Sequence, residues 1–183
     1  MSITMPQQSA KLKQAVESAE KSDIVIFGSR GDQGNNQERV YPADYAEVIS
    51  ISSLTQFGKL ADTTESNASY FFQGENVRII AEPCYLEPQR YVSGSSVATA
   101  LAAGVAALIL ACRRLGGSEA QIGRIKMVRN VLEEMTDKKV RPKNYVKPWL
   151  VFMNQDMNEK NGFEWLRARF GENGTYSSTD GRT

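Results

Sequence analysis

The sequence contains no histidine. Histidine is the commonest general base near neutral pH and the commonest transition-metal ligand, so its absence excludes any catalysis or metal site that needs one from this chain. The two cysteines, Cys84 and Cys112, are too few and too far apart for a zinc site or a disulfide framework, and both are expected to be free thiols. We therefore expect no metal and no cofactor, and any histidine-dependent reaction would have to take its base from elsewhere.

An excess of charge of either sign is also missing. Lys and Arg number 22 against 21 Asp and Glu, which disfavours nucleic acid and anionic membranes as partners. The longest apolar stretch, Val97 to Cys112, is shorter than the about 20 residues that span a bilayer. The N-terminal residues form no apolar signal segment, which predicts a cytoplasmic protein. Hydrophobic residues at 41% and charged residues at 23% are typical of a globular chain.

Short apolar runs and helical periodicities alternate along residues 1–117. The run Ile24 to Phe27 is continuous and rich in β-branched residues, which is typical of a strand buried on both faces, and it follows an amphipathic segment. This order predicts an α/β fold with a parallel sheet flanked by helices. The predicted helices are Ser9–Ala19 and Ser96–Leu115, and the predicted strands are Ile24–Phe27, Val48–Ile51, Tyr70–Phe72 and Val77–Ile80.

The segment Ser96 to Leu115 is apolar all round and ends at Gly116, which predicts a helix packed on every side. The composition changes after residue 117. We predict that residues 118–183 form a helical extension with a disordered tail. Its expected parts are a helix over Ile122–Leu132, a basic connector over Lys138–Lys147, a short helix over Phe163–Phe170 and the tail Gly171–Thr183.

Ser96 stands where a small-residue turn enters the apolar helix. The free N–H groups and partial positive charge of a helix N-terminus suit a nucleophile whose reaction develops an oxyanion. On local sequence alone, a serine that only caps the helix is the favoured interpretation, since Ser is a good N-cap. The sequence motifs around Ser96 and upstream of it decide between these two interpretations.

The segment GSSVATA at 94–100, followed by GVAAL at 104–108, resembles the nucleophile motif G-T-S-M-A-T-P of the subtilisin-like serine proteases and the Ala-rich helix after it. The segment YPADY at 41–45 is similar to the Y-P-A-x-Y block of that family. The strand at 24–27 with GDQG at 31–34 is similar to its oxyanion-hole strand and G-N-E-G turn. The sequence of residues 94–104 also resembles that of an intracellular fungal branch of the family.

The resemblance implies that Ser96 is the nucleophile and that its own N–H is one oxyanion donor. Asp32 stands at the oxyanion-hole position, where most members have Asn, and an ionised carboxylate accepts a hydrogen bond there instead of donating one. Ser2, Ile3 and Thr4 correspond to the M-S-L segment, one wall of the substrate pocket. Departures from the family pattern include Ser95 for Thr, Val97 for Met, Ala100 for Pro, Leu101 for His, and Gln73 where the family usually has Pro before Gly.

The family's catalytic Asp and His lie in the N-terminal half of the domain, and no counterpart is found in this sequence. The resemblance therefore implies the C-terminal portion of a subtilisin-like domain over residues 1–117, inactive alone. Its expected partners are a peptide or protein substrate and the missing N-terminal half. A pseudoprotease or peptide-binding module is the alternative. A nucleotide-binding α/β domain is disfavoured because Gly28, Gly31 and Gly34 give G-x-x-G-x-x-G, with no helix opening directly after it.

Overall fold

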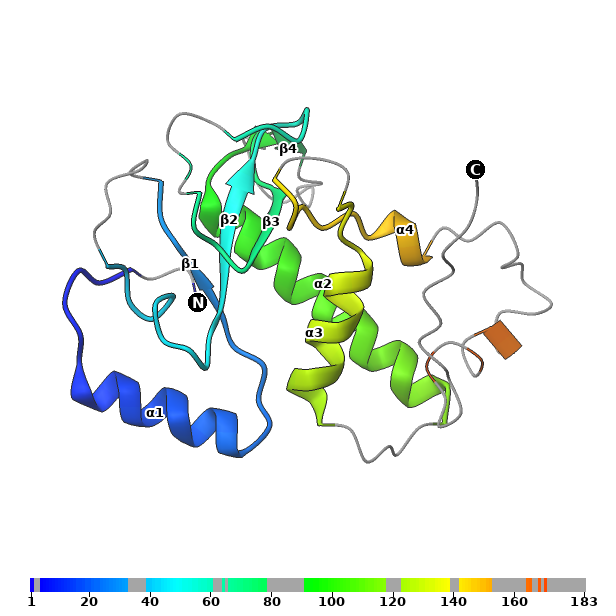
Figure 1. Ribbon diagram of the computed structural model, residues 1–183, viewed down its shortest axis with the longest axis horizontal. Helices are drawn as coiled ribbons and strands as arrows, with labels where there is room; N and C mark the ends of the chain where they lie inside the picture. The colour runs from blue at the N-terminus through cyan, green and yellow to red at the C-terminus, as the bar shows by residue number, and fades with distance from the viewer. Residues whose placement is uncertain are drawn as a thin grey trace, which may run out of the picture.

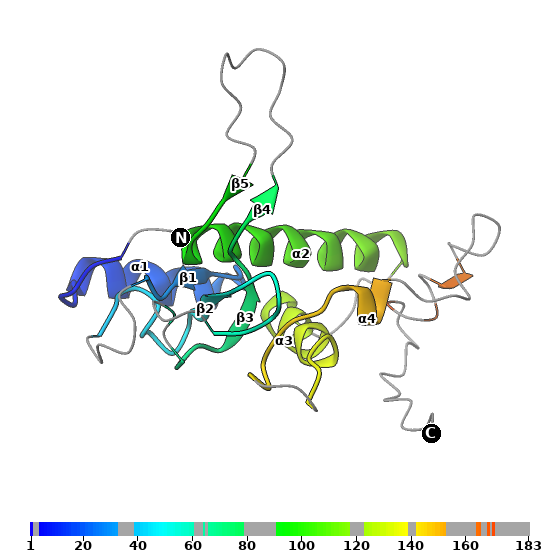
Figure 2. The ribbon, with the colours of Figure 1, turned by 90° about the horizontal axis from the view of Figure 1, so that it is seen from above.

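A computed structural model of the chain shows a small α/β body from which a two-stranded ribbon projects (Figure 1, Figure 2). The structure describes residues 1, 4–32, 39–60, 64, 66–78, 91–117, 123–138, 142–152, 164–165, 168 and 170. The elements are α1 (Ala10–Lys21), β1 (Phe27–Ser29), β2 (Ile49–Leu54), β3 (Tyr70–Gln73), β4 (Val77–Arg78), β5 (Tyr91–Val92), α2 (Ser95–Leu115), α3 (Arg124–Glu134) and α4 (Trp149–Phe152).

The main sheet is parallel, with β2 between β1 and β3. Phe27 pairs with Ile49 and Ile51 pairs with Tyr70, and every residue of β2 is buried. A parallel strand with both faces covered reads as a continuous apolar or small-residue run, as this one does. The predicted parallel sheet flanked by helices is therefore confirmed. A separate antiparallel pair, β4 and β5, forms the projecting ribbon in Figure 2.

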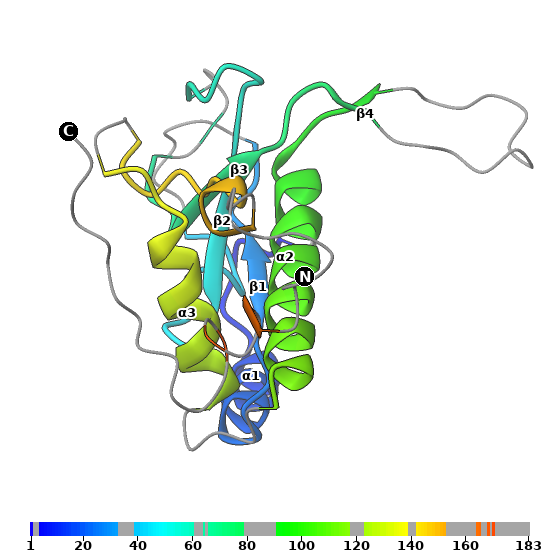
Figure 3. The same ribbon diagram turned by 90° about the vertical axis from the view of Figure 1, so that its right-hand side faces the viewer.

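The helix α2 packs along all three strands of the main sheet and against α3 (Figure 3). Its buried residues Ala98, Ala102 and Ile109 are 0% exposed and join one core cluster with the strands. The α3 residues of this cluster are Met127, Val128, Val131 and Leu132. α3 therefore shares the core of residues 1–117, while the boundary predicted after residue 117 stays a prediction.

The prediction that α2 is packed on every side is wrong. Ala103 and Ala107 are exposed, as are Leu101 at 40% and Leu108 at 47%. The sheet and α3 cover one face of the helix, and no described residue covers the opposite face. By length and composition α2 could also cross a membrane, which is weak evidence because the core helix of a globular protein passes the same test.

The first predicted helix is confirmed as α1, and the Ser9 hydroxyl accepts a 3.4 Å hydrogen bond from the Leu12 N–H at its start. The first predicted strand is shifted. Of Ile24–Phe27 only Phe27 lies in β1, which continues to Ser29. The predicted tail Gly171–Thr183 lies outside the described residues, as do most of the predicted helix Phe163–Phe170 and part of the basic connector.

Candidate active site

Ser96 is the second residue of α2 and its side chain is exposed. The helix begins after Gly94, whose φ of +134° and ψ of 161° belong to a region that only glycine adopts readily. The Val97 and Ala98 N–H groups both donate to the Gly94 carbonyl oxygen, at 3.0 and 3.2 Å. No described residue hydrogen-bonds the Ser96 hydroxyl or its backbone N–H. Both groups are therefore open to a ligand at this helix N-terminus.

The start of α2 is held against the carboxyl ends of the parallel strands. The Gly94 N–H donates to the Gly74 carbonyl oxygen at 2.7 Å. A Cβ added at Gly74 would lie 2.5 Å from the Ser53 Cβ and 2.8 Å from the Gly94 oxygen, so only glycine fits there. Gln73, the departure from the family pattern, is the last residue of β3 immediately before this contact.

A buried hydroxyl pair ties α2 to the end of β1. The Ser29 and Ser95 Oγ atoms lie 2.7 Å apart, and both residues are 1% exposed. The Thr99 hydroxyl donates to the Ser95 carbonyl oxygen at 2.8 Å, one turn further along the helix. Because buried hydroxyls are costly unless they are paired, this contact fixes β1 relative to Ser96. The sequence analysis did not identify Ser29. Its position, a serine at the end of an apolar strand, could have indicated a buried hydroxyl that needs a partner.

Asp32 reaches the same helix start from the turn after β1. Its Oδ1 accepts a 2.9 Å hydrogen bond from the Ser95 N–H, 63 residues away in the chain. Gly94 has no side chain to cap α2, so Asp32 supplies the cap from a distance. The structure thus brings Asp32 and Ser96 together, with the carboxylate accepting a hydrogen bond.

The predicted pocket wall is described only in part. Ser2 and Ile3 lie outside the described residues, and Thr4 is exposed. The next residue, Met5, exchanges two 2.9 Å backbone hydrogen bonds with Tyr41, so the first segment lies beside the block at 41–45.

A partly buried ion pair, which sequence reasoning also missed, joins this block to the segment between β1 and Asp32. Arg30 is 8% exposed, and its Nη1 lies 2.8 Å from the Asp44 Oδ1. The other Asp44 oxygen accepts from the Val40 N–H at 2.7 Å. An arginine directly after an apolar strand was the available signal. A buried charge needs a partner, so this pair holds the two segments together.

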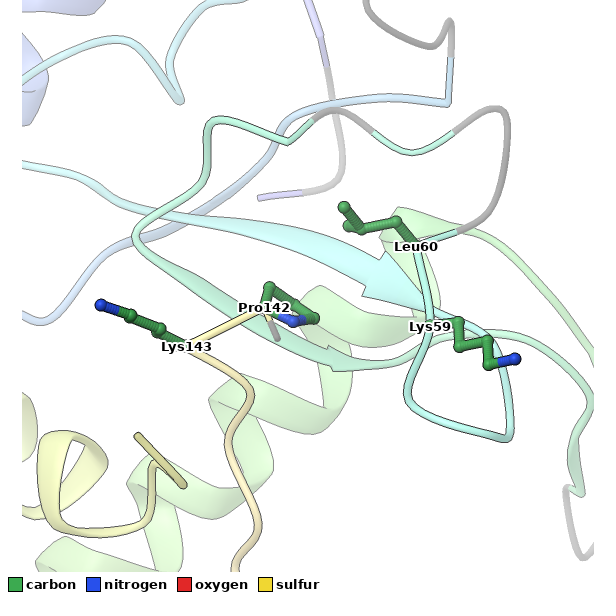
Figure 4. Close-up of a pocket in the computed structure, with 4 residues that line it drawn as sticks. All are labelled: Lys59, Leu60, Pro142 and Lys143. Atoms are coloured by element: carbon green, nitrogen blue, oxygen red, sulfur yellow. The ribbon is translucent and has the colours of Figure 1, made fainter. Parts of the chain in front are cut away.

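Other features of the described part of the chain offer no competing site. No cluster of His, Cys, Asp and Glu there could hold a metal ion. Burial raises the pKa of the Cys112 thiol, which makes it a poor nucleophile. A depression of about 480 Å³ is lined by Lys59, Leu60, Pro142 and Lys143. Figure 4 draws these four residues as sticks. Its two lysine side chains extend in opposite directions and do not converge on one ligand.

Comparison with known proteins gives a family and a fold. Residues 1–148 match the model of the subtilase family. The major intracellular serine protease of Bacillus subtilis is 29% identical over a region covering 60% of this chain and 35% of that protein. Subtilisin DY of Bacillus licheniformis is 33% identical, with 60% of this chain and 41% of that protein covered. The chain thus spans less than half the length of these relatives.

The likeness extends to solved structures. The self-cleaved protease domain of PatA matches with a TM-score of 0.68 and 20% identity, covering 84% of this chain and 59% of that domain. At this identity the match establishes the fold alone. The predicted subtilisin-like fold is confirmed, and the roles of Ser96 and Asp32 stay predictions.

Proposed function

The chain belongs to the subtilase family, and from that membership we propose that it carries the nucleophile position of a serine peptidase site, with Ser96 as the residue that would attack a peptide carbonyl. The observation that carries the proposal is the exposed Ser96 at the open N-terminus of α2. Its backbone N–H, which has no acceptor among the described residues, supports the proposal because such a donor would stabilise a developing oxyanion. A peptide or protein is the corresponding substrate.

The chain has no histidine to remove the proton from the Ser96 hydroxyl. Removing either the Ser or the His of such a triad costs about 10⁶ in kcat, and the residual rate comes from the oxyanion hole and substrate binding. On its own the polypeptide does not turn over peptide bonds. A complete triad takes its His and Asp from outside these 183 residues.

A second candidate is a peptide-binding pseudoprotease. The hydrogen bond from the Ser95 N–H to the Asp32 carboxylate favours it, because an acceptor beside the oxyanion position repels negative charge. The Asp32 carboxylate thus supplies no oxyanion donor there. The loss of one oxyanion donor costs about 10² to 10³ in rate, which is much less than the loss of the base.

Labelling with a fluorophosphonate tests the first proposal. We expect the isolated chain to be labelled no faster than its Ser96→Ala variant, because the hydroxyl has no base. Ser93→Ala, which changes the nearby exposed serine outside the helix, is the matched control. Labelling at the rate of an active serine hydrolase that Ser96→Ala abolishes and Ser93→Ala leaves intact would contradict the missing-base argument.

A complementation assay separates the two candidates. A subtilase segment that carries the family's Asp and His is added in trans, and cleavage of a fluorogenic peptide is followed. Cleavage that depends on Ser96 and rises in Asp32→Asn supports the peptidase proposal, because Asn donates without needing a proton. Peptide binding without any cleavage, in both the parent chain and Asp32→Asn, supports the pseudoprotease.

A further inference from the structure

The depression drawn in Figure 4 lies between two segments that are far apart in the sequence. Lys59 and Leu60 follow β2, while Pro142 and Lys143 come just before the residues that run beside β3. In Figure 4 Leu60 and Pro142 lie between the two lysine side chains, whose ammonium groups point outward at opposite ends. The centre of the depression is therefore apolar and its two ends are positively charged.

The first wall of the depression is a closed turn. The Thr55 N–H donates to the Lys59 carbonyl oxygen at 2.9 Å, and the Lys59 N–H donates to the Thr55 hydroxyl at 3.1 Å. Gly58 lies at φ +72°, and a Cβ added to it would lie 2.9 Å from the Cε1 atom of Tyr145, so the turn packs closely on that ring. Phe57, within the same turn, is 77% exposed. An aromatic side chain on a fixed turn can bury a large apolar area with little further loss of backbone freedom.

The second wall is held against β3. The Tyr145 N–H donates to the Pro142 carbonyl oxygen at 3.1 Å, which closes a turn around Lys143. The backbone of Phe71 in β3 makes two 2.9 Å hydrogen bonds with the residues on either side of Tyr145. Both walls therefore meet at the buried Tyr145 ring, and backbone hydrogen bonds set the shape of the depression before any ligand binds.

The charge of this surface has one sign, although the whole chain is close to neutral. Residues 138–147 contain five Lys or Arg and no Asp or Glu, and residues 55–60 contain one Lys and no acidic residue. Lys147 pairs with Asp137 at 3.0 Å, but no acidic residue in the described part of the chain pairs with Lys59 or Lys143. Basic side chains that their own protein leaves unpaired attract an acidic partner.

We propose that this depression docks an acidic, extended segment of another protein. One large apolar side chain of that segment is seated against Leu60 and Pro142, and a carboxylate on each side of it pairs with Lys59 and Lys143. The volume of about 480 Å³ lies within the range of about 300 to 1,000 Å³ that is usual for ligand sites. Because the two ammonium groups point apart, they match two carboxylates along a chain and not one small anion.

A nucleic acid is the other polymer that lysines beside an exposed aromatic ring could bind. The side chains between the two lysines are aliphatic, Leu60 and Pro142, and offer no ring on which a base could stack. They suit an apolar side chain better than a base, which favours the acidic peptide. This surface shares no residue with the site proposed at Ser96, so either proposal can fail without the other.

The test uses the full chain and a fluorescein-labelled peptide, Gly-Ser-Glu-Glu-Phe-Glu-Glu-Ser-Gly. We expect saturable binding by fluorescence anisotropy that weakens as NaCl is added, because salt screens exposed charges. One control peptide carries Gln in place of every Glu, and a second carries Ser in place of Phe. Each control peptide should bind about fivefold or more weakly, since the first lacks the ion pairs and the second lacks the apolar contact.

Two variants reverse the charge at the ends of the depression, Lys59→Glu and Lys143→Glu, both at exposed positions. Each should weaken binding about fivefold or more, and the double variant should instead bind a peptide in which Lys replaces every Glu. Lys126→Glu is the matched control, because Lys126 is an exposed lysine of α3 that does not line the depression. It should bind as the parent chain does, and melting temperatures confirm that all variants fold.

The proposal is overturned if the parent chain and both charge-reversed variants bind the peptide equally, or if the Glu and Gln peptides bind equally. The absence of saturable binding at protein concentrations up to about 1 mM would also overturn it. Tighter binding of a single-stranded oligothymidine than of the acidic peptide would overturn it in favour of a nucleic acid.

Discussion

The N-termini of α2 and α3 are both capped by an aspartate side chain from elsewhere in the sequence. The two carboxylates differ in how many backbone N–H groups they accept from. Each helix follows a glycine without a side-chain cap, Gly94 or Gly123, and each receives a carboxylate from a residue next to β1. Asp23 lies just before β1 and its two oxygens accept from the Arg124 and Ile125 N–H groups, at 2.6 and 3.1 Å.

At α2 the corresponding cap is incomplete. Within the described part of the chain, Asp32 accepts a hydrogen bond from the Ser95 N–H alone, and the Ser96 N–H has no partner. The first four N–H groups of any helix have no partner within the helix, and at α3 Asp23 accepts from the first two of them. The two caps therefore differ in which N–H the carboxylate does not reach, and at α2 it is the N–H of the proposed nucleophile Ser96.

The largest difference is expected from alanine at the two glycines. Gly94 lies at φ +134°, while Gly123 has an ordinary φ of −56°. Gly94→Ala should lower the free energy of unfolding by about 1 to 3 kcal/mol because of backbone strain. Gly123→Ala should cost less than about 1 kcal/mol. Urea unfolding measures both, and equal losses would show that the start of α2 does not depend on the glycine conformation.

The two carboxylate caps should differ by a smaller amount. Asp23→Ala removes two hydrogen bonds and should cost about 1 to 2 kcal/mol, whereas Asp32→Ala removes one and should cost about 0.5 to 1 kcal/mol. Urea unfolding of both variants beside the parent chain gives the comparison. A larger loss in Asp32→Ala would mean that the α2 cap is the stronger of the two.

The smallest effect is the pH dependence of the α3 cap. Burial pushes the pKa of Asp23 up, but the Arg124 and Ile125 N–H groups and the Arg124 charge outweigh it and hold the pKa below its ordinary value. A lowered folded pKa stabilises the protein above the unfolded value of about 3.9, and this contribution is lost as the pH falls through the folded pKa.

Asp23→Asn keeps a capping oxygen that does not titrate. Below about pH 4 the parent chain should therefore lose more stability than Asp23→Asn does. Urea midpoints measured for both proteins from pH 7 down to pH 2.5 test this expectation. If the midpoints of the two proteins fell in parallel with pH, titration of Asp23 would not be the cause of the stability lost at low pH.

Much of the fold and part of the site could be predicted from local sequence. The apolar run before β1, the amphipathic pattern of α1 and the small-residue turn before α2 each depend only on residues within one segment. The motif around Ser96 placed it at a helix start, which the structure confirms. The strand at 24–27 was misplaced because a strand exists only where a neighbour pairs with it, and the apolar run does not report that neighbour.

The sequence by itself determined that α1 and α2 become helices and that Ser96 lies in the first turn of α2. Only the tertiary structure decided that Asp32 and Asp23 cap helices 63 and 101 residues away, and that one apolar face of α2 stays exposed. Periodicity in the sequence shows that a face of a helix is apolar, but it does not show which segments cover that face. A helix N-terminus likewise accepts any carboxylate that the fold brings within reach, and that partner is set by packing among distant segments.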